Sequence, residues 1–125
     1  CNDWQLSLLP LIFKEQFKET FPKMKIVFIP HTFNDNYSIK KEAFNSLGMN
    51  SKANKKTFNI FANAVDNSDL TFFLDNSTLK SAMKKKENRE SLEKANYETI
   101  EYNEEMSVSD RMEVYNTIIS KLTKL

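Results

Sequence analysis

Glycine is almost absent from this sequence, since Gly48 is the only one among 125 residues. Loops that wrap the phosphates of a nucleotide need several glycines, because a side chain would keep the backbone away from the phosphates. The sequence therefore excludes a P-loop and a dinucleotide-binding fingerprint. Cysteine is equally scarce: one Cys cannot form an internal disulfide, so the fold depends on packing alone.

Residue types that bind metals or act as activated nucleophiles are also few. The chain has one histidine, His31, and one cysteine, Cys1. The two lie far apart in sequence and show no metal-ligand spacing. Cys1 has no neighbour in sequence that would activate its thiol. We therefore expect no metal and no catalytic cysteine.

Excess charge of one sign and long apolar runs are both missing. Eighteen basic and 17 acidic residues leave a formal net charge of +1. This balance predicts neither nucleic acid nor an acidic membrane as a partner, and no apolar run is long enough to span a bilayer. With 40% hydrophobic residues, the length suits one domain over residues 1–125 and is too short for two.

The hydrophobic pattern predicts alternating helices and strands. Apolar residues at three- and four-residue intervals predict helices at residues 4–21, 38–47, 55–66 and 78–94, and a last one that begins after Ser107 or Ser109. Asp3, Ser38 and Ser77 are the expected helix caps. Pro10 either kinks the first helix or marks its first turn. Short apolar or alternating runs predict strands at 26–29, 69–76 and 97–104, so the order favours a three-layer α/β sandwich around a short parallel sheet.

Candidate site residues come from the rule that ligands bind beyond the carboxyl ends of strands in open α/β sheets. His31 follows the first strand and can donate to a sugar hydroxyl or a phosphate, although the residues alone favour a loop histidine that bonds a carbonyl. Asp3 can bind a ligand hydroxyl or cap a helix, and capping is the commoner role. Trp4 can stack on a sugar or lie in the core. Asp75 ends the second strand and can face the cleft or begin the next helix.

Three stretches of the chain follow one another in an order known from a family. They are "NDWQLSLLPLIFKEQF", "KIVFIPH" and "FNIFANAVDNSDLTFFLDNSTLKSA". The first two resemble the Asp-Trp segment, the "LLP" run, the helix ending in Lys-Glu and the "KVVFTIHN" strand of starch and glycogen synthases. The third is similar to that family's next helix, strand and Ser-containing turn. The resemblance covers about the first 80 residues and does not extend to residues 84–125.

The resemblance implies a Rossmann-like domain and a role in glycosyl transfer. These enzymes have the two-domain GT-B fold, and the matched segment would be a fragment of the N-terminal, acceptor-side half. They transfer glucose from ADP- or UDP-glucose to an α-1,4-glucan with retention of configuration, in the cytoplasm or a plastid. They use no further cofactor and no structural metal. Asp3 and His31 carry over as catalytic residues, and Trp4 and Gln5 as substrate-binding residues.

The same resemblance also implies what the chain needs in order to act. Its expected partners are a glucan, a nucleotide sugar and the rest of its own GT-B enzyme. Because the donor-binding half is missing, the chain alone is expected to be inactive as a transferase. Asp3 and His31 are expected to converge at the carboxyl ends of the strands, facing a cleft.

Two other hypotheses remain open. The chain can be a non-catalytic α/β binding or assembly module, a decayed transferase half kept as a partner surface. The scarcity of glycine and the unmatched charged residues near the C-terminal end favour that hypothesis. It can also be a mature lipoprotein acylated on Cys1, although such proteins usually place a polar spacer where Trp4 and Leu6 stand here.

Overall fold

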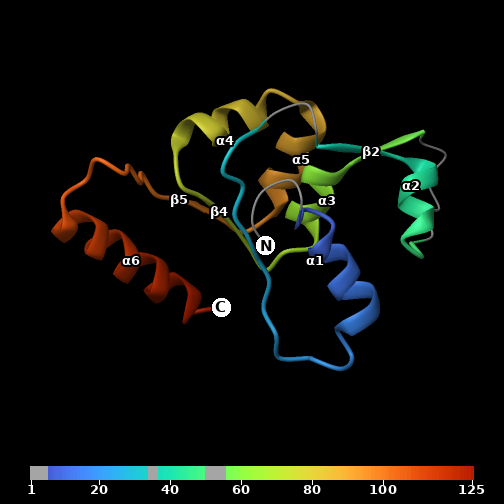
Figure 1. Ribbon diagram of the computed structural model, residues 1–125, viewed down its shortest axis with the longest axis horizontal. Coiled ribbons are helices and arrows are strands. Elements are labelled where there is room, and N and C mark those ends of the chain that lie inside the picture. The colour runs from blue at the N-terminus through green and yellow to red at the C-terminus, as the bar shows by residue number, and fades with distance from the viewer. Residues whose placement is uncertain (1–5, 34–36, 50–55) are drawn as a thin grey trace.

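The chain forms a mixed α/β structure, seen in a computed structural model that describes residues 6–33, 37–49 and 56–125 (Figure 1). In this described part, three parallel strands form the larger sheet in the order β1-β4-β5. They are β1 (Val27–Phe28), β4 (Leu70–Phe73) and β5 (Tyr97–Thr99). The predicted mixed α/β fold with a short parallel sheet is therefore confirmed, while its Rossmann-like, three-layer detail remains a prediction.

Strand β4 is the centre of the sheet, and all four of its residues are buried. Three large apolar residues and one threonine, all buried, are typical of a strand covered on both faces. Beyond the ends of the strands, the amide of Ile100 donates to the carbonyl of Phe73 at 2.8 Å, and that of Tyr102 to Leu74 at 2.9 Å. The pairing of β4 with the chain after β5 thus continues past the sheet and holds the two carboxyl ends side by side.

The first helix begins later than the sequence predicts. Helix α1 (Leu9–Ile12) continues as a π-helical turn, η2 (Phe13–Phe17). Pro10 lies in the first turn of α1, where its missing N–H costs no helical hydrogen bond, so the second of its two predicted roles is confirmed. The proposed cap Asp3 lies outside the described residues.

A second, antiparallel pair of strands was not predicted. Strand β2 (Ser38–Lys40) pairs with β3 (Thr57–Asn59), and helices α2 (Lys41–Ser46) and α3 (Ile60–Asp66) follow them directly. The predicted starts of both helices are therefore wrong, and Ser38 lies in a strand instead of capping a helix. Local periodicity could not show this, because each strand is three residues long and its partner is distant in sequence. Gly48 has φ +76° just after α2, as expected of a helix stop.

The predicted helix over residues 78–94 is two helices, α4 (Asn76–Met83) and α5 (Lys86–Lys94). Lys85 between them is extended, and the buried Asn88 donates its side-chain amide to the carbonyl of Ala82 at 3.1 Å. The carbonyl of Ala82 also accepts from the amide of Lys85 at 3.3 Å, so Asn88 adds a second donor at the end of α4, where a continuing helix would otherwise supply one. The predicted cap Ser77 is also wrong: Asp75 is the N-cap, and its carboxylate accepts from the amide of Thr78 at 2.6 Å.

Aromatic side chains form the centre of the core. Phe61 of α3 is fully buried, and its ring lies 5.7 Å from that of Phe28, 5.2 Å from Phe33 and 5.3 Å from Tyr37, measured between centroids. All three contacts are edge-on, the arrangement that the ring quadrupoles favour. Phe28 and Tyr37 flank the segment after β1, so this cluster fixes where that segment leaves the sheet.

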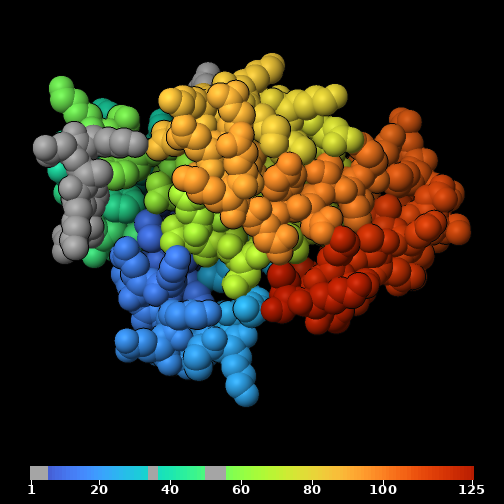
Figure 2. All heavy atoms as spheres, turned by 180° about the vertical axis from the view of Figure 1, so that it is seen from behind, coloured from blue at the N-terminus to red at the C-terminus, as the bar shows by residue number. Residues whose placement is uncertain are grey.

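Helix α6 (Val108–Leu122) forms one end of the molecule, opposite the end where α2 lies (Figures 1 and 2). Its N-cap is Ser107, one of the two predicted caps, whose hydroxyl accepts from the amide of Asp110 at 3.1 Å. Near its other end Lys121 donates to Glu98 of β5 at 2.6 Å. The predicted apolar stripe is present on α6, but most of it is exposed. No helix in residues 6–33, 37–49 or 56–125 is both long and apolar enough to cross a membrane.

Candidate functional site

A polar cleft of about 600 Å³ lies where the three parallel strands end. Each strand contributes the residues that follow it, as the topology of an open parallel sheet dictates. The lining residues are His31 after β1, Leu74 and Asp75 after β4, and Glu101, Tyr102, Asn103, Glu104 and Glu105 after β5. This cleft is the candidate functional site.

His31 reaches the cleft because Pro30 and the core residue Phe28 anchor the end of β1. Both are among the fully buried residues, whereas His31 is exposed. The carbonyl oxygen of His31 lies 3.1 Å from the hydroxyl of Thr78 in α4. The backbone of His31 is therefore tied to the first turn of α4, and its imidazole is accessible to a ligand.

Asp75 combines two roles that the sequence left as alternatives, because it caps α4 and also lines the cleft. Partial burial opposes the charged carboxylate and raises its pKa. Hydrogen bonds from the Ser77 hydroxyl, and from the amide and hydroxyl of Thr78, outweigh that effect, so the pKa of Asp75 lies below its ordinary value of 3.8. Asp75 is therefore an anion at neutral pH that accepts hydrogen bonds and does not serve as a general acid.

Glu101 connects the third strand to the start of α4. Its carboxylate accepts from the backbone amide of Asn76 at 3.1 Å and from the side-chain amide of the same residue. These bonds place a second carboxylate at the N-terminal end of α4, where the helix dipole favours negative charge. Asp75 and Glu101 are thereby held in fixed positions on two sides of Asn76.

The rim after β5 is acidic and locally braced. The side-chain oxygen of Asn103 accepts from the amide of Glu105 at 2.9 Å, which fixes a turn there. Glu104 and Glu105 add two exposed carboxylates to those of Asp75 and Glu101. With His31 as the one residue of this lining that can carry positive charge, the cleft is a strongly negative surface rich in hydrogen-bond acceptors.

The structure describes only part of the predicted site. His31 lies at the carboxyl end of β1, facing a cleft as predicted. Asp3, Trp4 and Gln5 lie outside the described residues, so their expected convergence with His31 stays a prediction. Sequence reasoning missed Glu101 and the residues after it. The predicted third strand covered residues 97–104, whereas β5 ends at Thr99, so the carboxyl-end rule applied to the predicted bounds reaches Glu105 but not Glu101.

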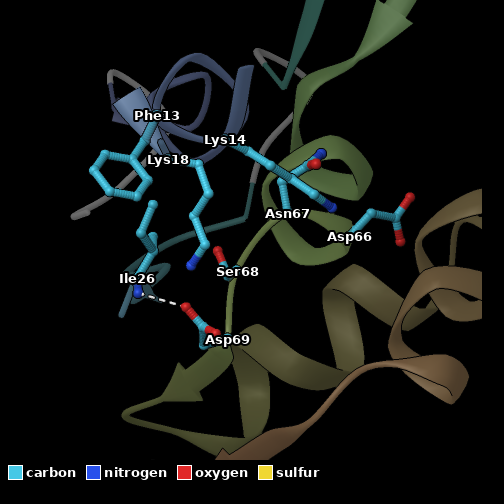
Figure 3. Close-up of a pocket in the computed structure, with 8 residues that line it drawn as sticks. All are labelled: Phe13, Lys14, Lys18, Ile26, Asp66, Asn67, Ser68 and Asp69. Carbon is cyan, nitrogen blue, oxygen red and sulfur yellow. Dashed lines mark hydrogen bonds between the residues drawn. The ribbon is translucent and has the colours of Figure 1, made fainter. Parts of the chain in front are cut away.

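A second hollow of about 250 Å³ lies at the opposite, amino-terminal ends of β1 and β4 (Figure 3). Its polar groups are used to join the strands: Asp69 accepts from the amide of Ile26 at 2.8 Å and from Lys25 at 3.3 Å. Figure 3 shows Lys14 and Lys18 extending from the first helical segment toward residues 66–69. These lysines lie near the end of α3, where the carbonyls attract cations, so we interpret this hollow as structural.

Comparison of the chain with protein-family models, with curated proteins and with solved structures finds no match. The function is therefore inferred from the cleft itself. In the described ranges, no three His, Cys, Asp or Glu side chains are grouped so that they could hold a metal ion.

Proposed function

We propose that the cleft binds an α-1,4-glucan and that the chain is the acceptor-side part of a glycosyltransferase similar to starch and glycogen synthases. In this proposal the sheet belongs to a Rossmann-like, three-layer domain, and His31 donates a hydrogen bond to a glucan hydroxyl. Asp3, Trp4 and Gln5 complete the site. The observation that carries the proposal is the position of His31 in a polar cleft at the carboxyl end of β1.

The charge of the cleft favours a neutral ligand rich in hydroxyl groups. Carboxylates such as Asp75 and Glu101 accept hydrogen bonds from hydroxyls, and bonds to an ionised acceptor are about twice as strong as neutral ones. The same carboxylates repel a diphosphate, because like charges a few ångströms apart interact unfavourably. The cleft therefore suits the glucan, while the nucleotide sugar requires the other half of the enzyme.

The experiment that tests this function is titration of the chain with a linear malto-oligosaccharide, followed by heteronuclear NMR. We expect shifts in the amide signals of His31, Asp75 and Glu101 that saturate with ligand. His31→Ala should weaken binding about tenfold, since it removes one hydrogen bond from an exposed site. Lys14→Ala in the second hollow is the matched control and should bind like the wild type.

Two outcomes would contradict the proposal. One is an absence of saturable shifts at millimolar glucan, and the other is a loss of binding in Lys14→Ala that equals the loss in His31→Ala. UDP-glucose or ADP-glucose should produce little or no shift at the cleft. We also expect the chain alone to show no transfer of glucose from either nucleotide sugar.

A second candidate function is a non-catalytic α/β assembly module, derived from a transferase half. The observation that favours it is the exposed apolar face of α6. The two candidates differ in a simple way: an assembly module binds a protein surface and leaves the glucan titration without response.

A further inference from the structure

Helix α6 has two faces that carry apolar residues, and the domain covers only one of them. The half-buried residues of α6 recur at intervals of three and four, and Lys121 among them bonds Glu98 of β5. A second set lies on the adjacent face and exposes 39–72% of each residue: Val108, Met112, Tyr115, Ile119 and Leu122. We call this second set the α6 stripe. In the described part of the chain, the ring of Tyr102 lies 6.2 Å from that of Tyr115, and the stripe is otherwise exposed.

The spacing of the α6 stripe is that of a helix-pairing surface. Its members alternate at intervals of four, three, four and three residues, the repeat by which two helices pack side by side. Along one border the residues Ser109, Asn116 and Thr123 recur every seven positions, and all three are uncharged. Two such helices can therefore approach along this border without like charges meeting.

We propose that the α6 stripe binds the same stripe of a second copy of this chain, with the two α6 helices antiparallel. The ends of the stripe are symmetric about its middle residue, because Val108 and Leu122 each lie seven positions from Tyr115, while Met112 and Ile119 lie three and four positions from it. A two-fold axis beside Tyr115 therefore sets Val108 of each copy against Leu122 of the other. This self-complementary arrangement is the one that a symmetric dimer requires.

The charges at the two ends of α6 select the antiparallel orientation. Four acidic residues and one basic residue lie at and just before its N-terminal end, and two basic residues lie at its C-terminal end; the former are Glu104, Glu105, Asp110, Arg111 and Glu113, and the latter are Lys121, which also pairs with Glu98 of β5, and Lys124. Antiparallel helices bring the acidic end of one copy beside the basic end of the other. Parallel helices would place like charges together, and their aligned dipoles would also repel.

The size of the α6 stripe predicts a weak dimer. Five large side chains with roughly 100 Å² accessible on each give about 500 Å² per copy, or about 1,000 Å² in total. That total lies at the low end of specific interfaces, so we expect a dissociation constant on the order of 10–100 μM. The dimer should therefore form and dissociate across an experimentally convenient range of concentration.

The α6 stripe adjoins the proposed glucan site but is not part of it. No residue of the stripe lines the cleft, although Tyr115 contacts Tyr102, and the acidic residues Glu104 and Glu105 before α6 also line the cleft. The two proposals are nevertheless tested separately. If the chain binds glucan but stays monomeric at every concentration, only the dimer is contradicted. A chain that dimerises without binding glucan contradicts the proposed function alone.

Sedimentation velocity from about 5 to 500 μM protein tests the dimer, because that range brackets the expected dissociation constant. The wild type should shift from monomer to dimer across it. Ile119→Glu, and separately Met112→Glu, should remain monomeric, because each places a charge in the middle of the stripe. Ser120→Glu is the matched control: it adds the same charge beside Ile119 but off the stripe, and it should dimerise like the wild type.

Cross-linking tests the orientation. In a Cys1→Ser background, Tyr115→Cys should form a disulfide between two copies of that same variant. Val108→Cys should form one only when it is mixed with Leu122→Cys. Self-cross-linking of Val108→Cys would overturn the antiparallel arrangement. A wild type that stays monomeric at every concentration would overturn the dimer, even if the stripe captured a foreign apolar helix. Circular dichroism of each variant checks that a monomeric variant is still folded.

Discussion

The cap on helix α4 offers the sharpest test of the structure. Replacing Asp75 by alanine removes the acceptor that lies 2.6 Å from the amide of Thr78 and 2.6 Å from the hydroxyl of Ser77. Loss of an N-cap costs about 1 kcal/mol, with a range of about 0.5–2. In Asp75→Ala the hydroxyl of Thr78 can still donate to the carbonyl of His31 at 3.1 Å, so we expect no further loss of stability from that hydroxyl.

The expected effect is large enough to measure by thermal unfolding. For a chain of 125 residues, about 1 kcal/mol lowers the melting temperature by roughly 3–5 °C. Asp75→Asn is the informative companion, because asparagine keeps an acceptor oxygen in the same place and caps almost as well as aspartate. Asp66→Ala is the matched control: Asp66 is exposed at the last position of α3, where it caps nothing.

The pH dependence gives the same prediction a second readout. The pKa of Asp75 is lowered in the folded state, so the stability that its charge contributes is present above the ordinary value and is lost as pH falls through the folded pKa. The difference in stability between the wild type and Asp75→Asn should therefore shrink as the solution is acidified below pH 3.8. If Asp75→Ala has the melting temperature of the wild type, or if Asp75→Asn is as unstable as Asp75→Ala, the side chain of Asp75 does not stabilise α4 as its cap.

Three further predictions concern single side chains. Thr71 is buried in β4 and its hydroxyl has no hydrogen-bond partner among the described residues, so Thr71→Val should stabilise the protein by about 1 kcal/mol in urea unfolding, and a loss of stability would contradict this. Asn88→Ala removes two side-chain hydrogen bonds of a buried residue, the one donated to the carbonyl of Ala82 at 3.1 Å and the one accepted from the side-chain amide of Asn59 at 2.5 Å, and should cost about 2–3 kcal/mol by the same assay, whereas a neutral result would refute the role of Asn88. Hydrogen bonding to Tyr102 raises the pKa of Tyr115, so Tyr102→Phe should lower the Tyr115 midpoint in an ultraviolet absorbance titration, and an unchanged midpoint would contradict that contact.

The strands that the sequence predicts well are those whose own residues specify them. The segment around Val27 is a short, continuous apolar run that β1 buries in part, and the segment around Leu70 is an apolar run with one threonine that β4 buries throughout; both compositions favour a strand in a parallel sheet. Strands β2 and β3 are different, because residues such as Ser38 and Thr57 acquire strand structure from each other across the chain. The break between α4 and α5 also involves side-chain bonds, since Asn88 donates back to Ala82 and accepts from Asn59, 29 residues earlier. Local propensity contains neither contact.

The candidate site was predictable to the extent that topology alone determines it. His31 lies in the cleft because it follows a parallel strand. The same rule did not identify Glu101, because the predicted third strand ran to residue 104 whereas β5 ends at Thr99. The double role of Asp75 could not be predicted, because it depends on where α4 begins. The exposure of the stripe on α6 could not be predicted either. A periodic apolar pattern shows that a helix has a face to bury, but not whether its own domain covers that face.

The position of β4 in the middle of the sheet has a consequence for how the chain folds. Val27 of β1 pairs with Leu70 of β4, 43 residues later, whereas β4 meets β5 after 26 residues. Neither pairing can form before β4 exists, and each must first close a long loop at an entropic cost. Long-range pairing of this kind slows folding, and on a ribosome β1 would emerge well before its only strand partner in the described sheet. The arrival of β4 is therefore the event that commits the chain to its sheet.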